Sequence, residues 1–277
     1  MITKVNGVAT LSALDIGELI RNKQGKQVRL TLKRGQTSRD VVVTPIGNAY
    51  NLRYRDWEYG KRRYVEKASN NSVGYLHLRA MGGNDISQFY REFYPVFNRQ
   101  GLIIDVRYNF GGNIDSFILE KLMRKAWMYW AGRNGKPTWN MQYAFRGHMV
   151  VLVNENTYSD GEAFADGFKR LGLGKTIGVR TWGGEIWLSS SNRLSDGGIA
   201  RAPMNGVYSA DGEWLIEGHG FKPDIVIDNL PHETFNGKDA QLERAIQHLK
   251  EQIAKDPREV PPVPVFPDKS FNNGPGN

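Results

Sequence analysis

The stretch "HMVVLVNENTYSDGEAFADGFKRLG" (residues 148–172) changes its character halfway along. Its first part is a continuous apolar run, which is typical of a strand that is covered on both faces of a parallel sheet. Its second part, from Ser159, has the pattern of an amphipathic helix. The stretch therefore predicts a buried strand, a short turn and a helix, which is the repeating unit of an α/β fold.

The same alternation precedes this stretch. "VGYLHLRAM" (residues 73–81) predicts a strand, and "DISQFYREFYPVFN" (residues 85–98) predicts a helix. "GLIIDVRYN" (residues 101–109) is a second near-continuous apolar strand, and "IDSFILEKLMRKAWMYW" (residues 114–130) predicts a second helix. We expect an α/β core with a largely parallel sheet over residues 73–255.

The first 47 residues predict a small β-rich module. "ITKVNG" is a short strand that enters an Asn-Gly turn, "ALDIGELIRN" is an amphipathic helix, and "VRLTLKRGQTSRDVVVT" is a hairpin. Residues 48–72 are polar, aromatic and basic and are interpreted as a connector that ends in a turn. Residues 256–277 are Pro-rich and predict an extended tail.

The composition is that of a globular protein, with 277 residues of which 40% are hydrophobic and 24% charged. No cysteine is present, which excludes disulfides and thiol catalysis. No apolar run is long enough to predict a membrane span. The start of the chain lacks the pattern of a secretory signal, and a cytoplasmic and a periplasmic location both stay open.

The net charge of +8 is concentrated at the start of the chain, because residues 1–67 hold 14 Lys and Arg against 6 Asp and Glu. We interpret this as the solvated surface of a small module. No RNA-binding aromatic motif or zinc-finger spacing is present, so no nucleic acid partner is expected.

Three motifs follow predicted strands, where open α/β sheets gather their sites. The first is "DVRYNFGGN" (residues 105–113). Backbone N–H groups of Gly111 and Gly112, which precede a helix, can stabilise an oxyanion. The alternative is an ordinary Gly-rich turn between a strand and a helix.

The second motif is "NTYSDGEAF" (residues 156–164), in which Ser159 stands where a helix begins. A serine at that position is either an N-cap or a nucleophile, and position alone does not separate the two. The third is "EGHGFKPDIVI" (residues 217–227), in which Glu217 either orients a base or is a surface residue before a turn. No metal-ligand spacing is present, and neither a metal nor another cofactor is expected.

Taken in order, these motifs resemble the S41 serine peptidases, which include the carboxy-terminal-processing and tricorn branches. "GYLHLRAM", "GLIIDVRYNFGGN", "VLVNENTYSDGEAFADGFK", "GVRTWGG" and "EGHGFKPDI" each match a family block. The resemblance implies a layered α/β core of the crotonase/ClpP type over residues 73–255. Residues 1–47 resemble the C-terminal half of a PDZ domain.

The resemblance also implies roles for individual residues. Ser159 would attack a peptide carbonyl, and the N–H of Asp160 with that of Gly112 or Gly111 would hold the oxyanion. Glu217 would belong to the relay that orients a histidine. The implied substrates are peptides or unfolded proteins, and a homo-oligomer is possible.

The identity of the base separates the two branches. The carboxy-terminal-processing branch uses a lysine, but Gly184 occupies that position in "GVRTWGGE". The tricorn branch uses a histidine that lies upstream of the PDZ domain. His219 is the histidine nearest to a motif, but its position is not that of the family base. We therefore expect the general base to lie outside these 277 residues.

Two other functions stay open. One is a non-catalytic S41-fold protein that binds peptides or other ligands, and the other is a hydratase or thioesterase of the crotonase type. The presence of Ser159, the Gly-Gly turn and Glu217 together favours the peptidase, because neither alternative needs all three.

Overall fold

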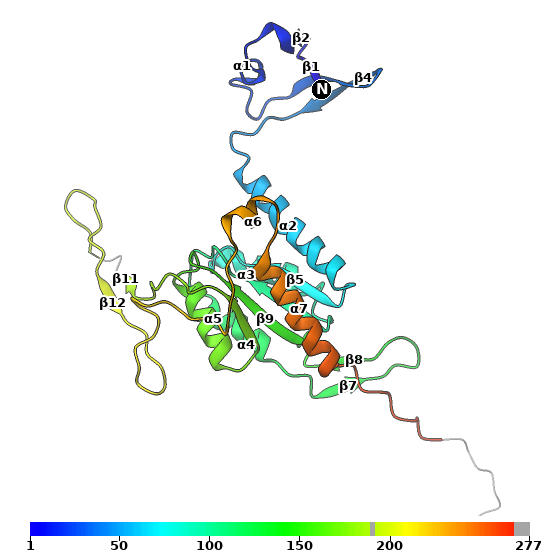
Figure 1. Ribbon diagram of the computed structural model, residues 1–277, viewed down its shortest axis with the longest axis vertical. Coiled ribbons are helices and arrows are strands. Elements are labelled where there is room, and N and C mark those ends of the chain that lie inside the picture. The colour runs from blue at the N-terminus through cyan, green and yellow to red at the C-terminus, as the bar shows by residue number, and fades with distance from the viewer. Residues whose placement is uncertain (189–191, 269–277) are drawn as a thin grey trace, which may run out of the picture. The chain divides into compact units, whose positions relative to one another are not determined.

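The computed structural model describes residues 1–188 and 192–268. The chain forms two compact units, residues 1–59 and residue 60 onward, each with its own sheet (Figure 1).

The first unit holds a four-stranded sheet in the order β2-β1-β3-β4. Its elements are β1 (Ile2–Val5), β2 (Val8–Ala9), η1 (Thr10–Ser12), α1 (Ile16–Ile20), β3 (Val28–Arg34) and β4 (Thr37–Val43). Asn6 and Gly7 both have positive φ, as a tight Asn-Gly hairpin turn requires. The predicted turn and hairpin are confirmed, and the likeness to half a PDZ domain stays a prediction.

The second unit is built on a five-stranded sheet in the order β13-β10-β9-β6-β5, and its strand pairs are all parallel. The strands are β5 (Val73–His77), β6 (Gly101–Asp105), β9 (His148–Val153), β10 (Lys175–Gly178) and β13 (Ile225–Val226). The predicted α/β core with a parallel sheet is confirmed.

Helices cover both faces of this sheet (Figure 1). α3 (Gly83–Phe93), α4 (Asp115–Met123) and α5 (Asp160–Arg170) pack on one face, where they meet side chains such as Leu102, Ile104 and Val151. α7 (Ala240–Lys255) packs on the other face, against side chains such as Ile103 and Val150. Because successive strand residues point to opposite faces, β5, β6 and β9 each contribute to both core clusters.

Residues 50–68 form a helix, α2 (Tyr50–Ala68), so the interpretation of residues 48–72 as a connector missed a regular element. Val65 is fully buried in the cluster under α7, whereas most side chains of α2 are polar, charged or aromatic and partly exposed. A helix with so narrow an apolar face has a weak helical pattern, which explains why the sequence did not indicate it.

The helix predicted over residues 114–130 is too long. α4 ends at Met123, and β7 (Met128–Trp130) follows and pairs with β8 (Thr138–Asn140) as an antiparallel hairpin. Aromatic side chains in residues 127–130 favour an extended chain with cross-strand partners, and this preference overrides the helical spacing.

The remaining elements are β11 (Trp187–Leu188), β12 (Pro203–Asn205) and α6 (Pro231–Phe235). Residues 256–268 have no regular secondary structure, and the rest of the predicted tail lies outside the described residues. None of the helices in the described residues is both long and apolar enough to span a membrane.

Candidate active site

Loops at the carboxyl ends of four adjacent strands contact one another. The loop after β5 meets the loop after β6, because Met81 N–H donates to Gly111 O over 2.8 Å. The loop after β9 contacts the loops after β6 and β10 through Thr157. The Thr157 hydroxyl donates to Val106 O, and its backbone carbonyl accepts from Trp182 N–H.

The first two predicted motifs follow β6 and β9. The third, residues 217–227, lies between β12 and β13 and contains β13, so the expectation that it directly follows a strand is wrong. It still contacts the loop after β10, because Thr181 N–H donates to Phe221 O.

Ser159 has a backbone conformation that L-residues rarely adopt, with φ 55° and ψ −132°. An ordinary N-cap residue is extended and its side chain accepts a hydrogen bond from the first turn. The Ser159 hydroxyl makes no such capping bond. A strained residue of this kind persists when the surrounding structure imposes it, and such residues cluster at functional sites. Ser159 is nevertheless the N-cap residue of α5, with Glu162 in the capping-box position, so its role as a nucleophile stays a prediction.

The Glu162 side chain caps the backbone N–H of Ser159 at the start of α5. Its carboxylate is fully buried and accepts the N–H of Ser159 over 3.1 Å. It also accepts the N–H groups of Gly183 and Gly184 over 2.8 and 2.9 Å, and the hydroxyl of Thr181. The Glu162 side chain therefore fixes the position of the Ser159 backbone relative to the loop after β10.

Gly111 lies directly against the serine. A Cβ at Gly111 would come within 2.5 Å of the Ser159 Cβ and 3.0 Å of its Oγ, and the φ of Gly111 is +75°. The N–H of Gly111 donates to Asn109 Oδ1 over 2.8 Å. That donor is already engaged, so it is the weaker of the two predicted oxyanion donors.

Gly112 and Asp160 have backbone N–H groups that donate to no acceptor in residues 1–188 and 192–268. Gly112 follows the glycine that touches Ser159, and Asp160 follows Ser159 itself. Two unengaged N–H groups near Ser159 are compatible with the predicted oxyanion hole, which stays a prediction.

The side chain of Asp160 joins the two turns. Its Oδ2 accepts the N–H groups of Ile114 and Asp115 over 2.7 and 3.1 Å, so the first residue of α5 caps α4. The side-chain amide of Asn109 donates to Leu78 O, and the backbone carbonyl of Asn109 accepts from Tyr158 N–H. These bonds fix the spacing between the Gly-Gly turn and the serine turn.

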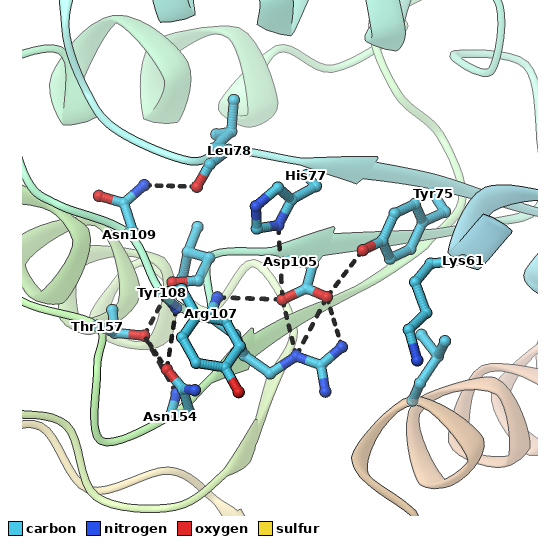
Figure 2. A network of polar contacts seen from close by, with 12 residues as sticks. Lys61, Tyr75, His77, Leu78, Asp105, Arg107, Tyr108, Asn109, Asn154 and Thr157 are labelled. Carbon is cyan, nitrogen blue, oxygen red and sulfur yellow. Dashed lines mark hydrogen bonds and ion pairs between the residues drawn. The ribbon is translucent and has the colours of Figure 1, made fainter. Parts of the chain in front are cut away.

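A buried network of polar side chains surrounds Asp105 at the end of β6 (Figure 2). Arg107, which is 2% exposed, donates to Asp105 over 2.6 to 3.1 Å. It also donates to Asp239 and Gln241 at the start of α7. Asp105 in turn accepts the hydroxyl of Tyr75 over 2.9 Å. The network ties the loop after β6 to the helix on the opposite side of the sheet.

Glu217 lies across the loop after β10. Its Oε2 accepts the N–H groups of Glu185 and Ile186 over 2.7 and 2.8 Å, and Gly218 N–H donates to Gly183 O. Glu217 therefore holds this loop in place. Its predicted part in orienting a histidine stays a prediction.

No histidine or lysine in the described part of the chain is hydrogen-bonded to the Ser159 hydroxyl. His77 is fully buried near Asp105 Oδ1, at 3.9 Å, and burial lowers the pKa of its ring. His148 starts β9, at the end opposite Ser159, where its ring bonds Asp256 O over 2.8 Å. The ring of His219 lies 3.0 Å from Gly220 O in its own loop. None of these three rings is hydrogen-bonded to the Ser159 hydroxyl, and the identity of the base stays a prediction.

Peptidase family S41 matches residues 72–227, which is more than half of the chain and includes all of these loops. The chain belongs to peptidase family S41. The S41 domain thus contains Ser159, the Gly-Gly turn and Glu217.

Tricorn-type members are among the curated relatives of this S41 chain. It is 35% identical over 265 residues to the tricorn protease of Thermoplasma acidophilum and 35% identical to tricorn protease homolog 1 of Streptomyces coelicolor, covering 95% and 94% of this chain. It is 36% identical over 87% of its length to a putative tricorn-like protease C-terminal subunit of Sulfurisphaera tokodaii.

A crystal structure of the tricorn protease superposes on 91% of this chain with a TM-score of 0.84 and 35% identity. The chain spans about a quarter of the length of the tricorn relatives, 25% for the Thermoplasma and Streptomyces proteins and 30% for the Sulfurisphaera subunit. It is a tricorn-type S41 chain by sequence and by fold.

Glu185, in the loop that Glu217 holds, carries a buried carboxyl group. It is 3% exposed, and its Oε2 has no hydrogen-bond partner among the described residues. Burial, followed by the charges of Glu162 and Asp160, raises the pKa of Glu185 to about 8. Burial also raises the pKa of Asp160 to about 7. The S41 site thus holds two carboxyl groups that are protonated well above the usual range.

These raised pKa values predict that the protein loses stability as pH rises. The folded state holds protons on Glu185 and Asp160 that the unfolded chain releases near pH 4, so unfolding becomes easier between about pH 4.5 and pH 8. Glu185→Gln should remove up to about 5 kcal/mol of this pH dependence, because one pKa unit corresponds to about 1.4 kcal/mol. Urea unfolding at pH 5, 7 and 9 measures it.

Glu213→Gln, at an exposed position, is the matched control and should keep the pH dependence of the native protein. An unchanged slope in Glu185→Gln would show that Glu185 titrates normally.

Sequence reasoning missed Glu162, Glu185 and Asn109. A signal for Glu162 was present, because Ser159 and Glu162 have the spacing of a capping box. Nothing in the sequence signals Glu185 or Asn109, since their roles depend on contacts between loops that are distant along the chain. No group of three or more His, Cys, Asp or Glu side chains within residues 1–188 and 192–268 is arranged to hold a metal ion.

Proposed function

We propose that this chain carries the nucleophile and the oxyanion hole of a tricorn-type serine peptidase. The substrates are peptides or unfolded polypeptides. The observation that carries the proposal is the strained backbone of Ser159, which lies directly against Gly111 and precedes the unengaged N–H of Asp160.

The reaction proceeds through an acyl-enzyme. Ser159 Oγ attacks the scissile carbonyl while a base takes its proton, and the tetrahedral oxyanion accepts hydrogen bonds from Gly112 N–H and Asp160 N–H. Collapse of the intermediate breaks the C–N bond, and the leaving amine takes the proton back from the base. A water molecule then hydrolyses the ester and regenerates Ser159.

The base is a histidine supplied by a segment outside residues 1–277, and Glu217 belongs to the relay that orients it. A relative of similar sequence is named a C-terminal subunit of a tricorn-like protease, which supports a division of the enzyme between segments. It is also supported by the rings of His77, His148 and His219, which bond other groups and not the Ser159 hydroxyl.

Labelling with a fluorophosphonate, with the adduct located by peptide mass spectrometry, tests this function. The chain is labelled alone and together with the segment that supplies the histidine, in native, Ser159→Ala and Ser87→Ala forms. We expect labelling at Ser159 with the added segment, no labelling of Ser159→Ala, and native labelling of Ser87→Ala, which alters an exposed serine of α3.

Labelling of the chain alone would show that its own residues include the base, and His219 would be the first residue to replace. Absence of labelling in both states would overturn the proposal and favour a non-catalytic protein that binds peptides or other ligands.

A further inference from the structure

The β7–β8 hairpin carries a groove that the proposed reaction does not use. The groove has a volume of ≈ 400 Å³. It is lined by Phe97, Trp130, Thr138, Trp139, Gln142 and Tyr143. Four of the six lining side chains are aromatic. Trp130 is 54% exposed and Tyr143 is 47% exposed, so this aromatic surface faces solvent in a single copy of the chain.

The groove is preformed. The ring of Phe97 lies 5.4 Å from that of Trp139 and 5.0 Å from that of Tyr143. Trp139 Nε1 donates to Ala144 O over 3.0 Å, and the ammonium group of Lys121 lies 5.6 Å from the centre of the Tyr143 ring. Aromatic side chains that are already held in place lose little conformational entropy when they bind a partner.

The tail of the same chain has the chemistry that such a groove accepts. Residues 256–268 read "DPREVPPVPVFPD" and include five prolines. Pro-rich segments of this kind adopt polyproline II structure, and aromatic-lined grooves are the surfaces that bind them. Val265 is 96% exposed and Phe266 is 63% exposed, so the apolar side chains of the tail are uncovered too.

The tail begins at the edge of the groove. Arg146 Nη2 donates to Arg258 O over 3.1 Å and also to Glu259 O. The same guanidinium lies 5.1 Å from the centre of the Trp139 ring and 5.4 Å from that of Tyr129. Arg146 therefore connects the start of the tail to the aromatic surface.

The charges of the two segments are complementary. Residues 124–140, which contain the hairpin, hold four basic and no acidic residues. Residues 256–268 hold three acidic residues and one basic residue. Attraction between them adds to the contact between prolines and aromatic rings.

We propose that the Pro-rich tail of one copy of this chain binds the aromatic groove of a second copy. Arg146 holds the tail at residues 258–259, and the following residues run on as an extended chain with Val265 and Phe266 exposed (Figure 1). Val265, Phe266 and Trp130 are all more than half exposed in a single copy, so the tail does not cover its own groove. Exchange of tails in both directions gives a two-fold dimer.

Sedimentation velocity over a range of concentrations tests the proposal without reference to peptidase activity. The proteins are the native chain, a chain that ends at Glu259, Trp130→Ala, and Trp214→Ala, which alters an exposed tryptophan outside the groove. We expect the native chain and Trp214→Ala to dimerise. Removal of the tail and Trp130→Ala should each weaken the dimer about 30-fold or more, as loss of a central aromatic contact does.

Mixing provides the decisive result. The truncated chain keeps the groove and Trp130→Ala keeps the tail, so a mixture should form heterodimers through one tail-groove contact. A synthetic peptide of residues 256–268 should bind the truncated chain and change its tryptophan fluorescence, and this measurement requires no folded variant.

Three results would overturn the proposal. The native chain could stay monomeric at every concentration, the truncated chain could dimerise like the native one, or the peptide could fail to bind the truncated chain. A monomeric native chain whose groove binds the peptide only after truncation would instead show that each tail occupies its own groove.

Discussion

Arg107→Met should lower the free energy of unfolding by about 3–5 kcal/mol at pH 7, because it removes one partner of a buried ion-pair network. Arg107 is 2% exposed and donates to both Asp105 and Asp239. Asp105 is fully buried and Asp239 is 6% exposed. Methionine fills much of the same volume, so the loss comes mainly from the buried carboxylate of Asp105, which is left without its cation, whereas Asp239 keeps its ion pair with Lys61 at 2.7 Å.

The effect should depend on pH in a defined direction. In the native protein burial raises the pKa of each carboxyl, but the charge and hydrogen bonds of Arg107 outweigh burial and hold both pKa values below the ordinary range. This stabilisation is present above about pH 4 and is lost at lower pH. In Arg107→Met burial acts without the full compensation, so the carboxyls take up protons at higher pH. The deficit relative to the native protein should shrink between pH 7 and pH 5.

Urea unfolding of both proteins at several pH values measures this difference. Arg170→Met is the matched control, because Arg170 pairs with Asp166 on the exposed side of α5. Its loss should cost about 0.5 kcal/mol or less. A deficit in Arg107→Met that does not change with pH would show that the unpaired carboxylate of Asp105 is not the cause.

The strands of the core were predictable because their sequence pattern has one physical cause. β6 and β9 are covered on both faces, so almost every residue in them is apolar. The loops of the site follow those strands, and the order of strand and helix was enough to bring the Gly-Gly turn and Ser159 to one edge of the sheet.

Contacts between distant segments were not predictable from the sequence. Glu185 is polar and lies in a Gly-rich loop, yet it is buried, and its backbone N–H donates to the carboxylate of Glu217. β7 looked like the end of a helix because its cross-strand partners lie in residues 138–140. In both cases the deciding partner lies more than five residues away, beyond the range of a local pattern.

Gly112→Ala should destabilise the protein by several kcal/mol, on the order of 3–5, and should abolish labelling at Ser159. A Cβ at Gly112 would lie 1.8 Å from Met81 O and 2.1 Å from Met81 C. These are backbone atoms and cannot move aside as a flexible side chain can. The φ of Gly112 is +157°, which adds conformational strain to the collision.

The strain cannot be relieved locally. Asn113 N–H donates to Met81 O over 2.8 Å and Met81 N–H donates to Gly111 O over 2.8 Å, so Met81 is bonded on both sides of the glycine. Any shift that admits a methyl group must break one of these bonds and displace the N–H that we assign to the oxyanion hole. The expected loss therefore combines unfolding energy with loss of the site.

Gly60→Ala is the control for adding a methyl group elsewhere. Gly60 lies within α2, and a Cβ there would meet nothing within 4 Å. Alanine should stabilise that helix by up to about 1 kcal/mol. Thermal unfolding of the two variants should therefore move in opposite directions. A Gly112→Ala protein as stable as the native one would mean that the Gly-Gly turn moves away from Met81 freely, and a turn that moves freely cannot hold the oxyanion donor that we assign to Gly112.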